Sequence, residues 1–431
     1  MKLCVIGLGY VGLPVAIVFA SRGLKVVGVD INVEKIIALN KGKLPSKELG
    51  LSRLFAEVAK NGMLNFSGDI SSGVQCSDVV ILAVPTPIRD GLVDLRYLTI
   101  ALEDVRAELH KGQLIVIEST IPPGTTFGFV KPFLEASGLK IGVDIYLAHV
   151  PERIAPGRAI EELLNSPRVV GGADPESTRR AIEVYSKVNP NLYPTDATTA
   201  EFVKLIENAF RDINIAYANL LALIAQNIGV DAYEAIRLAN THPRVNIHMP
   251  GAGVGGPCLT KDPYMLASLF GEFWGTELIK LARRINEYMP SHMVGLVEKA
   301  LSENGVELRG ARVAVLGAAY KGGVDDTRES PSRRVVKELL EIGLDVVVYD
   351  PYTPESFGAK RVDSLENAVG NADAIVIVTD HPEFKTIDLD MLSKKMRNRI
   401  IIDGRRVIDP YRACESGFKY YGIGFGRMFK L

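Results

Sequence analysis

Residues 2–30 read KLCVIGLGYVGLPVAIVFASRGLKVVGVD, and this stretch decides the fold. A short apolar run at residues 3–6 precedes a glycine-rich turn, an apolar segment at residues 13–20 and a β-branched run at residues 25–29. Short apolar and β-branched runs are typical of buried strands, and the longer segment between them is typical of a helix. The stretch therefore predicts a β-α-β unit with two parallel strands.

The turn of this unit has the pattern G-x-G-x-x-G, formed by Gly7, Gly9 and Gly12, and Asp30 ends the second strand. The first glycine permits a tight turn, the second lets the backbone approach a pyrophosphate, and the third allows close packing of helix and strand. Asp30 would accept hydrogen bonds from a ribose and repel a 2′-phosphate, and the two residues after it supply no arginine. NAD is therefore expected rather than NADP. The alternative is a structural turn that binds no cofactor.

The same pattern of strand-like runs returns near the C-terminus. Residues 312–317, 345–350 and 374–379 repeat the patterns of residues 2–7, 25–30 and 79–84. The second copy has Ala318 and Ala319 in place of the later glycines, so we expect a different, phosphate-bearing ligand there, with Lys321 as its counter-charge. We predict an α/β protein with two Rossmann-like, doubly wound domains, and with an inserted loop near residues 322–331 in the second.

Composition limits the possible functions. The chain has 431 residues, enough for two or three domains, and its net charge of -1 gives no overall field to recruit nucleic acid or a membrane. The four widely spaced cysteines form neither a disulfide framework nor a zinc-ligand pattern, so we expect no metal and reduced thiols in the cytoplasm. Cys4 and Cys76 are expected to be small core side chains. The uncharged residues 3–21 fit a strand, a turn and a helix better than a membrane span, because glycines interrupt them.

A long helix is predicted between the two α/β regions. Residues 198–228 contain no glycine or proline and are rich in helix-forming residues. Their apolar positions occupy more than one face, which favours burial against a second copy of the chain, so a homodimer through this central helix is expected. The predicted domains are an NAD-binding domain at residues 1–197, a helical dimerisation region at residues 198–300 and a second Rossmann-like domain at residues 301–431.

The most informative loop is GAGVGGPCLTKDP at residues 251–263. Its glycines let the backbone pass close to a ligand. Lys261, and a helix that starts after Asp262, would lower the pKa of the Cys258 thiol. A nucleophilic cysteine beside a nicotinamide suggests oxidation through a thiohemiacetal to a thioester. The alternative is that Cys258 is a small core side chain.

Lys204, Asn208 and Arg211 form a polar stripe on the long helix. At about 100° per residue they lie within about 60° of one another. Such a stripe is either a solvated face or a contact for an anionic or hydroxylated ligand, and the pattern alone leaves both open.

Ordered motifs along the whole chain resemble the UDP-sugar 6-dehydrogenases, also grouped as UDP-glucose/GDP-mannose dehydrogenases. Besides the first glycine loop, Lys204 and Asn208, the motifs are PTP at 85–87, STIPPGT at 119–125, PER at 151–153, GGPC at 255–258, YK at 320–321, DTRESP at 326–331 and DGRR at 403–406. The resemblance implies oxidation of a sugar C6 alcohol to a carboxylate with two NAD per turnover, supplying a uronic acid for polysaccharide or glycan.

The resemblance also implies the role of each catalytic residue. Cys258 would capture the aldehyde, and water would hydrolyse the resulting thioester. Lys204 would stabilise charge on the substrate oxygen, with Asn208 hydrogen-bonded beside it. Asp262 and Thr120 would manage water and protons, and Glu152 would act as a general base in hydrolysis.

Ligand contacts follow from the same resemblance. Those expected for NAD are Gly7, Gly9, Tyr10, Val11, Gly12, Asp30, Pro85, Thr86, Ser119, Thr120, Lys261 and Arg328. Those expected for the UDP-sugar are Glu152, Arg153, Ile154, Lys204, Asn208, Arg211, His242, Arg244, Gly255, Tyr320, Lys321 and Arg405. His242 and Arg244 match a position where family members offer an arginine across the dimer.

Two stretches bear on the sugar. PERIAPGR at residues 151–158 and NTHPRVN at residues 240–246 resemble the branch that acts on UDP-N-acetylhexosamines, and within it the UDP-N-acetyl-D-mannosamine 6-dehydrogenases. Pro257 and Lys261 depart from that branch, and residues 259–262 instead resemble the UDP-glucose type. UDP-N-acetylmannosamine is the expected substrate, with UDP-N-acetylglucosamine or UDP-glucose, oxidised by the same mechanism, as alternatives.

Two further hypotheses belong to other classes. A two-electron NAD-dependent hydroxyacid dehydrogenase would use Lys204 and Asn208 and leave Cys258 structural, but it would not explain the second Rossmann-like domain. A non-catalytic dinucleotide sensor would leave both the lysine and the cysteine without a role.

Overall fold

The computed structural model describes residues 1–44, 48, 50–89, 92–271 and 273–426. They form two compact units, Met1–Glu207 and Asn208–Leu431. The boundary falls inside one long helix, α9 (Ala197–Ile228). The division into three domains at residues 197 and 300 stays a prediction.

A single large sheet organises the N-terminal unit. Among its described residues, eight strands pair in the order β10-β9-β8-β7-β4-β1-β2-β3, and only β8 and β9 run antiparallel to each other. The strands are β1 (Lys2–Ile6), β2 (Lys25–Val29), β3 (Leu64–Ser67), β4 (Val79–Leu82), β7 (Leu114–Ile117), β8 (Tyr146–His149), β9 (Arg168–Gly172) and β10 (Leu192–Asp196); β5 (Ile88–Arg89) and β6 (Leu92–Val93) form a separate hairpin. The predicted β-α-β unit is confirmed as β1, α1 and β2.

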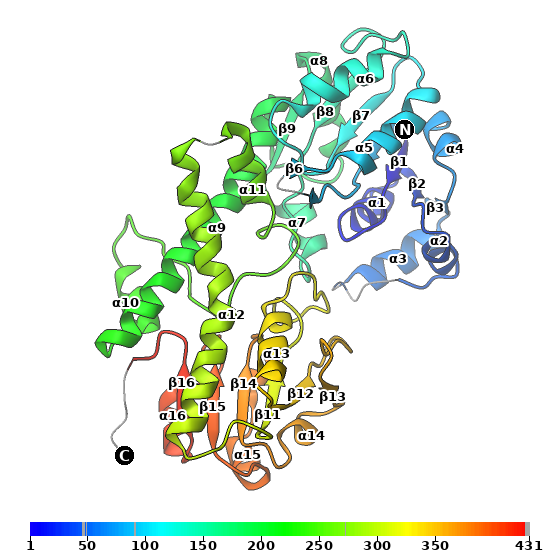
Figure 1. Cartoon of the computed structure of the whole chain (residues 1–431). Helices are drawn as coiled ribbons and strands as arrows, with labels where there is room; N and C mark the ends of the chain where they lie inside the picture. Colours follow the sequence, from blue (N-terminus) through cyan, green and yellow to red (C-terminus); the bar gives the residue numbers. More distant parts are fainter. Residues whose placement is uncertain (45–47, 49, 90–91, 272, 427–431) are drawn as a thin grey trace. The chain divides into compact units, whose positions relative to one another are not determined.

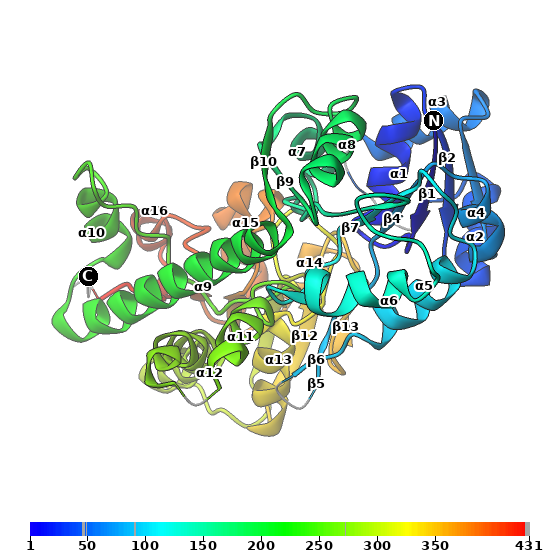
Figure 2. The ribbon, with the colours of Figure 1, turned by 90° about the horizontal axis from the view of Figure 1, so that it is seen from above.

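Helices cover both faces of this sheet. They are α1 (Gly12–Ser21), α2 (Val33–Asn40), α3 (Leu51–Lys60), α4 (Ile70–Gln75), α5 (Arg96–Ala107), α6 (Lys131–Glu135) with the preceding π-helical turn η1 (Thr126–Val130), α7 (Ala159–Asn165) and α8 (Pro175–Tyr185). Leu3 and Val5 of β1 pack into the core on one face, and Cys4 and Ile6 into the core on the other. Figure 2 shows α1 and α3 on one side of the strands and α5 and α6 on the other.

The uncharged N-terminal stretch is explained by burial. Residues 12–20 of α1 are all buried, so this helix is apolar on every side because protein surrounds it. Among the described residues, no helix is both long enough and apolar enough to cross a membrane.

The C-terminal unit repeats the architecture on a smaller scale. Its described strands form a parallel sheet of six in the order β13-β12-β11-β14-β15-β16, which can be followed by the labels in Figure 1. The strands are β11 (Arg312–Leu316), β12 (Asp345–Tyr349), β13 (Lys360–Arg361), β14 (Ala374–Ile377), β15 (Ile400–Asp403) and β16 (Lys419–Gly422). The order β12-β11-β14 repeats β2-β1-β4, so the predicted α/β fold with two doubly wound sheets is confirmed.

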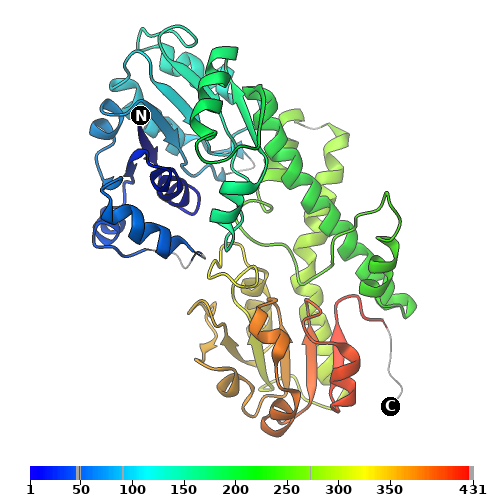
Figure 3. The ribbon, with the colours of Figure 1, turned by 180° about the vertical axis from the view of Figure 1, so that it is seen from behind.

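The remaining helices belong to this unit or lead into it. They are α9, α10 (Ala232–Ala239), α11 (Asp262–Ala267), α12 (Glu277–Glu303), α13 (Pro331–Glu341), α14 (Leu365–Val369), α15 (Leu389–Lys395), α16 (Pro410–Glu415) and the short 3-10 turns η2 (Ser268–Phe270), η3 (Trp274–Thr276) and η4 (Pro382–Thr386). Figure 3 shows the strands and helices of this unit from behind. The predicted long helix is confirmed, and α9 starts one residue before the predicted position 198.

The inserted loop of the second copy is also confirmed. β1 and α1 are joined by residues 7–11, whereas β11 and α13 are joined by residues 317–330. α13 begins where the side chain of Ser330 accepts a hydrogen bond from the Ser332 amide and a proline occupies the first turn. The longer connection leaves room for a loop between strand and helix.

Two details differ from the sequence predictions. β4 ends at Leu82, not at residue 84, because the Ser119 hydroxyl bonds both the amide (2.9 Å) and the carbonyl (2.8 Å) of Val84. Cys4 is buried as predicted, but Cys76 is exposed, so the core interpretation of Cys76 is wrong. Cys76 follows the last residue of the short helix α4 and lies outside the apolar strand.

Candidate functional site

The first glycine loop has the geometry that a pyrophosphate requires. Gly7 has φ +93°, and a Cβ there would lie 2.5 Å from the Ala83 carbonyl oxygen. A Cβ on Gly12 would lie 1.9 Å from the Gly7 carbonyl oxygen, whereas a Cβ on Gly9 would meet nothing within 4 Å. The first and third glycines are therefore needed for packing, and the second leaves open space. These residues fit a dinucleotide, which the N-terminus of α1 would face.

Asp30 lies beside this loop at the end of β2. Its carboxylate accepts hydrogen bonds from the amides of Leu8 (2.9 Å) and Asn32 (2.9 Å) and from the ammonium group of Lys35 (2.6 Å). Burial would raise the pKa of Asp30, but the Lys35 contact and the backbone amides outweigh it and hold this pKa below its usual value. The acid is thus charged and ready to accept hydrogen bonds. Lys35 was not predicted from the sequence; Asn32 positions it by capping the start of α2.

The ends of β4 and β7 bring together other residues predicted to contact NAD. Pro85 and Thr86 follow β4, and Ser119 and Thr120 follow β7. The Thr86 hydroxyl donates to the Thr120 carbonyl oxygen at 2.6 Å. Because these four residues follow strands, they lie at the carboxyl edge of the sheet. β4 and β2 flank β1 on opposite sides, so the direction of the connections reverses at this edge, which is where α/β sheets bind ligands.

Lys204 and Glu152 form a buried pair in the same unit. The Lys204 ammonium group lies 2.9 Å from a Glu152 carboxylate oxygen and 2.7 Å from the Glu152 carbonyl oxygen. Burial would raise the pKa of Glu152, but the charge of Lys204 outweighs it and keeps the pKa below its usual value. Burial, with the same positive charge, lowers the pKa of His149 to about 3, so this histidine is neutral. The part of the polar stripe that carries Lys204 is therefore not a solvated face.

A second buried ion pair involves residues that were not predicted from the sequence. Arg168, at the start of β9, donates to Glu118 at 2.5 Å, and the Tyr185 hydroxyl donates to the same oxygen at 2.7 Å. Burial raises the pKa of Glu118, and the nearby charge of Glu152 adds to the effect against the counter-charge of Arg168. The charge of Arg168 also acts on Glu152, whose pKa it helps to lower.

Arg153 and Ile154, the two residues after Glu152, are held by contacts of their own. Arg153 forms an ion pair with Glu207 and donates to the Pro167 carbonyl oxygen at 2.7 Å. The Ile154 amide donates to the second carboxylate oxygen of Glu152 at 2.8 Å. The segment after β8 thus fixes the Glu152 carboxylate from its own backbone.

In the C-terminal unit, Asn208 and Asp262 join the long helix to the cysteine loop. The Asn208 amide donates to Asp262 at 2.6 Å, and Lys261 pairs with the other carboxylate oxygen at 2.5 Å. The amides of Lys261 and Asp262 both donate to the carbonyl oxygen of Cys258, at 3.1 and 2.9 Å. Cys258 is half-buried, in the turn that leads into α11. This helix begins at Asp262, as the sequence predicted to within one residue.

The glycines of the cysteine loop permit contact with the second Rossmann-like sheet. A Cβ on Gly255 would lie 2.8 Å from the Tyr320 side chain, and one on Gly251 would lie 2.5 Å from the Arg405 guanidinium. Arg405 also donates to the Gly253 carbonyl oxygen at 3.0 Å. Gly255, Tyr320 and Arg405, all predicted to contact the substrate, are therefore brought together beside the cysteine loop.

Other predicted residues lie in different surroundings. Lys321 follows Tyr320 in the loop after β11. Arg328 pairs with Asp326 at 2.6 Å. Arg211, His242 and Arg244 are exposed; the Arg244 amide lies 3.3 Å from a ring nitrogen of His242. The polar stripe is thus divided, since Lys204 and Asn208 are buried and Arg211 is not.

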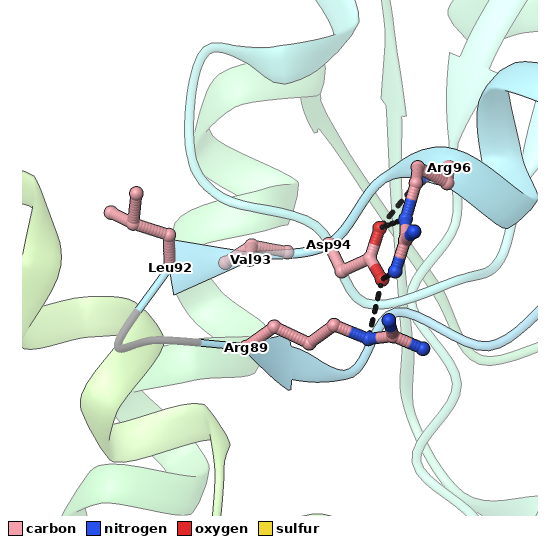
Figure 4. Close-up of a pocket in the computed structure, with 5 residues that line it drawn as sticks. All are labelled: Arg89, Leu92, Val93, Asp94 and Arg96. Carbon is pink, nitrogen blue, oxygen red and sulfur yellow. Dashed lines mark hydrogen bonds and ion pairs between the residues drawn. The ribbon is translucent and has the colours of Figure 1, made fainter.

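A shallow pocket lies on the β5–β6 hairpin (Figure 4). Arg89, Leu92, Val93, Asp94 and Arg96 line it. Asp94 pairs with Arg89 at 3.0 Å and Arg96 at 2.7 Å, and the hydrogen bonds from Arg96 lower the Asp94 pKa to about 2. Its lining includes none of the predicted site residues. Among the described residues, no group of three or more His, Cys, Asp or Glu could hold a metal ion.

A dinucleotide loop in one α/β unit, with a buried lysine on the adjoining helix and a cysteine loop packed on a second such unit, defines an NAD-dependent oxidoreductase. Residues 1–189, 198–288 and 314–410 match the NAD binding domain, the central domain and the UDP binding domain of the UDP-glucose/GDP-mannose dehydrogenase family. The chain belongs to this family.

Several relatives and solved structures are similar over nearly the whole chain. The UDP-N-acetyl-D-mannosamine dehydrogenase of Pyrococcus horikoshii is 47% identical over 99% of this chain and 100% of its own, and its structure matches with a TM-score of 0.92. The UDP-N-acetyl-mannosamine dehydrogenase of Staphylococcus aureus is 38% identical, with a TM-score of 0.87 over 98% of each chain. A UDP-glucose dehydrogenase from Pyrobaculum islandicum is 32% identical, with the same TM-score and coverage.

Proposed function

We propose that this protein oxidises the C6 alcohol of UDP-N-acetyl-D-mannosamine to the carboxylate, with NAD as the electron acceptor and Cys258 as the covalent nucleophile. One observation carries the proposal: Lys204 and Asn208 lie one turn apart on α9, are both buried, and each holds a carboxylate, Glu152 or Asp262. Buried charges with specific partners on a helix are expected where an enzyme stabilises a reacting oxygen.

The first oxidation removes a hydride and a proton from the alcohol. Bound NAD would supply the hydride acceptor for both oxidations, held by Gly7–Gly12, by Asp30 and by the residues after β4 and β7. As the hydride leaves carbon, negative charge accumulates on the substrate oxygen. The Lys204 ammonium group is the cation that would stabilise this charge, and Glu152 fixes its position through contacts of 2.9 and 2.7 Å.

The second oxidation requires a covalent bond to the aldehyde. The Cys258 thiolate would add to the carbonyl carbon, and the oxygen would take up a proton to give a thiohemiacetal. Loss of a second hydride and of that proton leaves a thioester. Water then adds to the thioester carbon, the C–S bond breaks, and the carboxylate and the Cys258 thiol are released. Asp262 and Thr120 would order the water and its protons, and Glu152 would act as the general base.

The substrate assignment rests on the relatives and on two segments of the chain. The relatives at 47% and 38% identity carry the name UDP-N-acetylmannosamine dehydrogenase, and a UDP-glucose enzyme follows at 32%. Residues 151–158 and 240–246 resemble the same branch. The UDP group would be bound in the C-terminal unit by Tyr320 and Arg405, which lie beside the cysteine loop, and by Lys321, the residue after Tyr320.

A matched pair of cysteine variants tests the covalent step. Cys258→Ser should bind NAD normally yet lose uronate formation by at least about 100-fold, because an alkoxide is far harder to generate than a thiolate. Cys76→Ser, at an exposed cysteine, should retain full activity. Uronate formation by Cys258→Ser at the wild-type rate would show that Cys258 is not the covalent nucleophile and would overturn the proposed mechanism.

We also propose a homodimer through the central helix. Seven large apolar side chains of α9 are exposed: Phe202, Ile206, Phe210, Tyr217, Leu220, Ile224 and Ile228. At about 100° per residue they fall within about 80° of one another, a single apolar stripe that a second copy would cover.

Light scattering tests this assembly. The wild type should have twice the chain mass of 46.9 kDa, and Ile224→Lys should reduce it to one chain. Lys299→Ala, at an exposed position on α12, is the control and should stay dimeric. A monomeric wild type, or a dimeric Ile224→Lys, would contradict the proposal.

A further inference from the structure

Three consecutive residues after β14 hold the loop that joins β11 to α13. The Thr379 hydroxyl donates to the Ala319 carbonyl oxygen at 2.6 Å. The Gly322 amide donates to the Asp380 carboxylate at 3.1 Å, and the Gly323 amide donates to Nδ1 of His381 at 3.1 Å. Because the three contacts are spread from residue 319 to residue 323, they fix the whole tip of the loop.

His381 also bonds to the strand on the other side of β11. Since its Nδ1 accepts the Gly323 amide, the ring proton lies on Nε2, which donates to Asp350 at 2.9 Å. Both side chains are fully buried. Asp350, in turn, accepts the amides of Ala318 at 2.7 Å and Ala319 at 3.0 Å. One histidine therefore links Gly323, in the middle of the loop, through Asp350 to the beginning of the loop.

Close packing leaves this arrangement little freedom. A Cβ on Gly317 would lie 2.3 Å from the Thr379 side chain, and a Cβ on Gly322 would lie 2.3 Å from the Asp380 carbonyl oxygen. The ring of Tyr352 stacks on His381 with centroids 4.9 Å apart and planes 16° from parallel. The loop and the segment after β14 are thus in backbone contact, with the histidine ring held between partners on several sides.

We propose that His381 is a positioning residue for the nucleoside diphosphate of the substrate, acting through the loop that carries Tyr320 and Lys321. The inference rests on the proposed function, since that function places the UDP group on this loop. His381 touches no ligand in this scheme. It holds the loop backbone in the shape that presents both side chains, and its effect is on substrate affinity more than on chemistry.

Variants of His381 separate its two hydrogen bonds. His381→Asn keeps an acceptor near the place of Nδ1, His381→Gln keeps a donor near the place of Nε2, and His381→Phe keeps only the aromatic stack. UDP affinity and NAD affinity are measured by calorimetry for each protein, and amide hydrogen exchange is followed in the peptide that covers residues 317–323. His110→Phe, in the N-terminal unit, is the matched control.

His381→Phe should weaken UDP binding by about tenfold or more, since two buried hydrogen bonds are lost, while NAD binding changes by less than about twofold. Exchange at residues 317–323 should accelerate, with the Asn and Gln variants between wild type and Phe. In turnover, KM for the UDP-sugar should rise more than kcat falls. His110→Phe should match the wild type in every measurement.

The other possible results contradict either the role of His381 or the proposed function. If wild type binds UDP and the three variants bind it equally well, His381 does not position the loop, whatever the proposed function. If His381→Phe does not fold, the Asn and Gln variants decide the question by the same criterion. If wild type does not bind UDP, the proposed function fails and this inference fails with it.

Discussion

The two Rossmann-like units carry the same strand, loop and acid, but they use them differently. In the N-terminal unit, the space where a Cβ of Gly9 would point is open, and Asp30 accepts three hydrogen bonds, one of them from the half-exposed Lys35. In the C-terminal unit, Ala318 and Ala319 are buried and their amides donate hydrogen bonds to Asp350.

The acid at the end of the second strand makes the difference. Asp350 accepts five hydrogen bonds from described residues, including one from buried His381, so its oxygens have no capacity left for a ribose. We propose that a ribose takes the place of Lys35 on Asp30, because the partly exposed Lys35 side chain can turn to water. The same fold thus has a loop that fits a dinucleotide in one unit, and in the other a loop whose acid is fully hydrogen-bonded within the protein.

The largest effect is expected from breaking the first loop. Gly12→Ala places a Cβ 1.9 Å from the Gly7 carbonyl oxygen, so we expect a loss of stability of about 3 kcal/mol or more and no NAD binding. Gly9→Ala is the matched control, because its Cβ meets open space. It should fold like wild type in a thermal melt yet lose NAD affinity, since the methyl group fills the approach of the pyrophosphate. Equal stability of the two variants would refute the distinction.

Breaking the second loop should have the next largest effect. Asp350→Asn replaces a carboxylate oxygen that accepts backbone amides with an amide donor, so we expect a loss of about 3 kcal/mol in urea unfolding. Asp30→Asn should cost only about 1 kcal/mol but should weaken NAD binding. A larger loss of stability for Asp30→Asn would show that we have assigned the two acids the wrong way round.

The pH dependence of Asp350→Asn has a definite sign. Burial would raise the pKa of Asp350, but the bond from His381 and the backbone amides hold the folded-state pKa below the usual 3.8. Its contribution to stability is therefore complete above pH 3.8 and is lost as the pH falls through the folded-state pKa. The difference in unfolding free energy between wild type and Asp350→Asn should be constant near neutral pH and should become smaller only under acid conditions. A gap that narrows as the pH rises would be inconsistent with a carboxylate of lowered pKa.

The smallest effect is expected at Lys35. Its ammonium group lies 2.6 Å from Asp30 at a partly exposed position, so Lys35→Met should cost less than about 1 kcal/mol. The Asp30 pKa, followed by NMR, should rise, because the Lys35 contact lowers it. Lys41→Met, at an exposed lysine beyond α2, is the control. An unchanged Asp30 pKa would mean that Lys35 does not hold the acid in solution.

Local patterns were enough to predict most of the fold. β1, α1, β2, β7, β11, β12 and β14 lie where short apolar runs placed them, and α9 lies where glycine and proline are absent. The sequence also predicted which loops would carry glycines at close contacts. These features depend on neighbours in the chain, so they can be recognised from spacing and composition.

Contacts across the sheet could not be predicted in this way. Glu118 and Arg168 are 50 residues apart and meet because β9 pairs with β8 in the antiparallel direction. His381 and Asp350 meet across β11, which lies between their strands. Strand order and direction decide such pairs, and no local pattern in the chain encodes them.

The most direct test of the central claim is the number of NADH molecules formed per UDP-sugar consumed. UDP-N-acetylmannosamine, UDP-N-acetylglucosamine and UDP-glucose are compared in parallel, each at a limiting amount. We expect two NADH from UDP-N-acetylmannosamine and slower turnover of the others. Two NADH from another sugar alone would keep the role of Cys258 and overturn the substrate. One NADH per sugar would mean that oxidation stops at the aldehyde, and it would contradict the covalent mechanism.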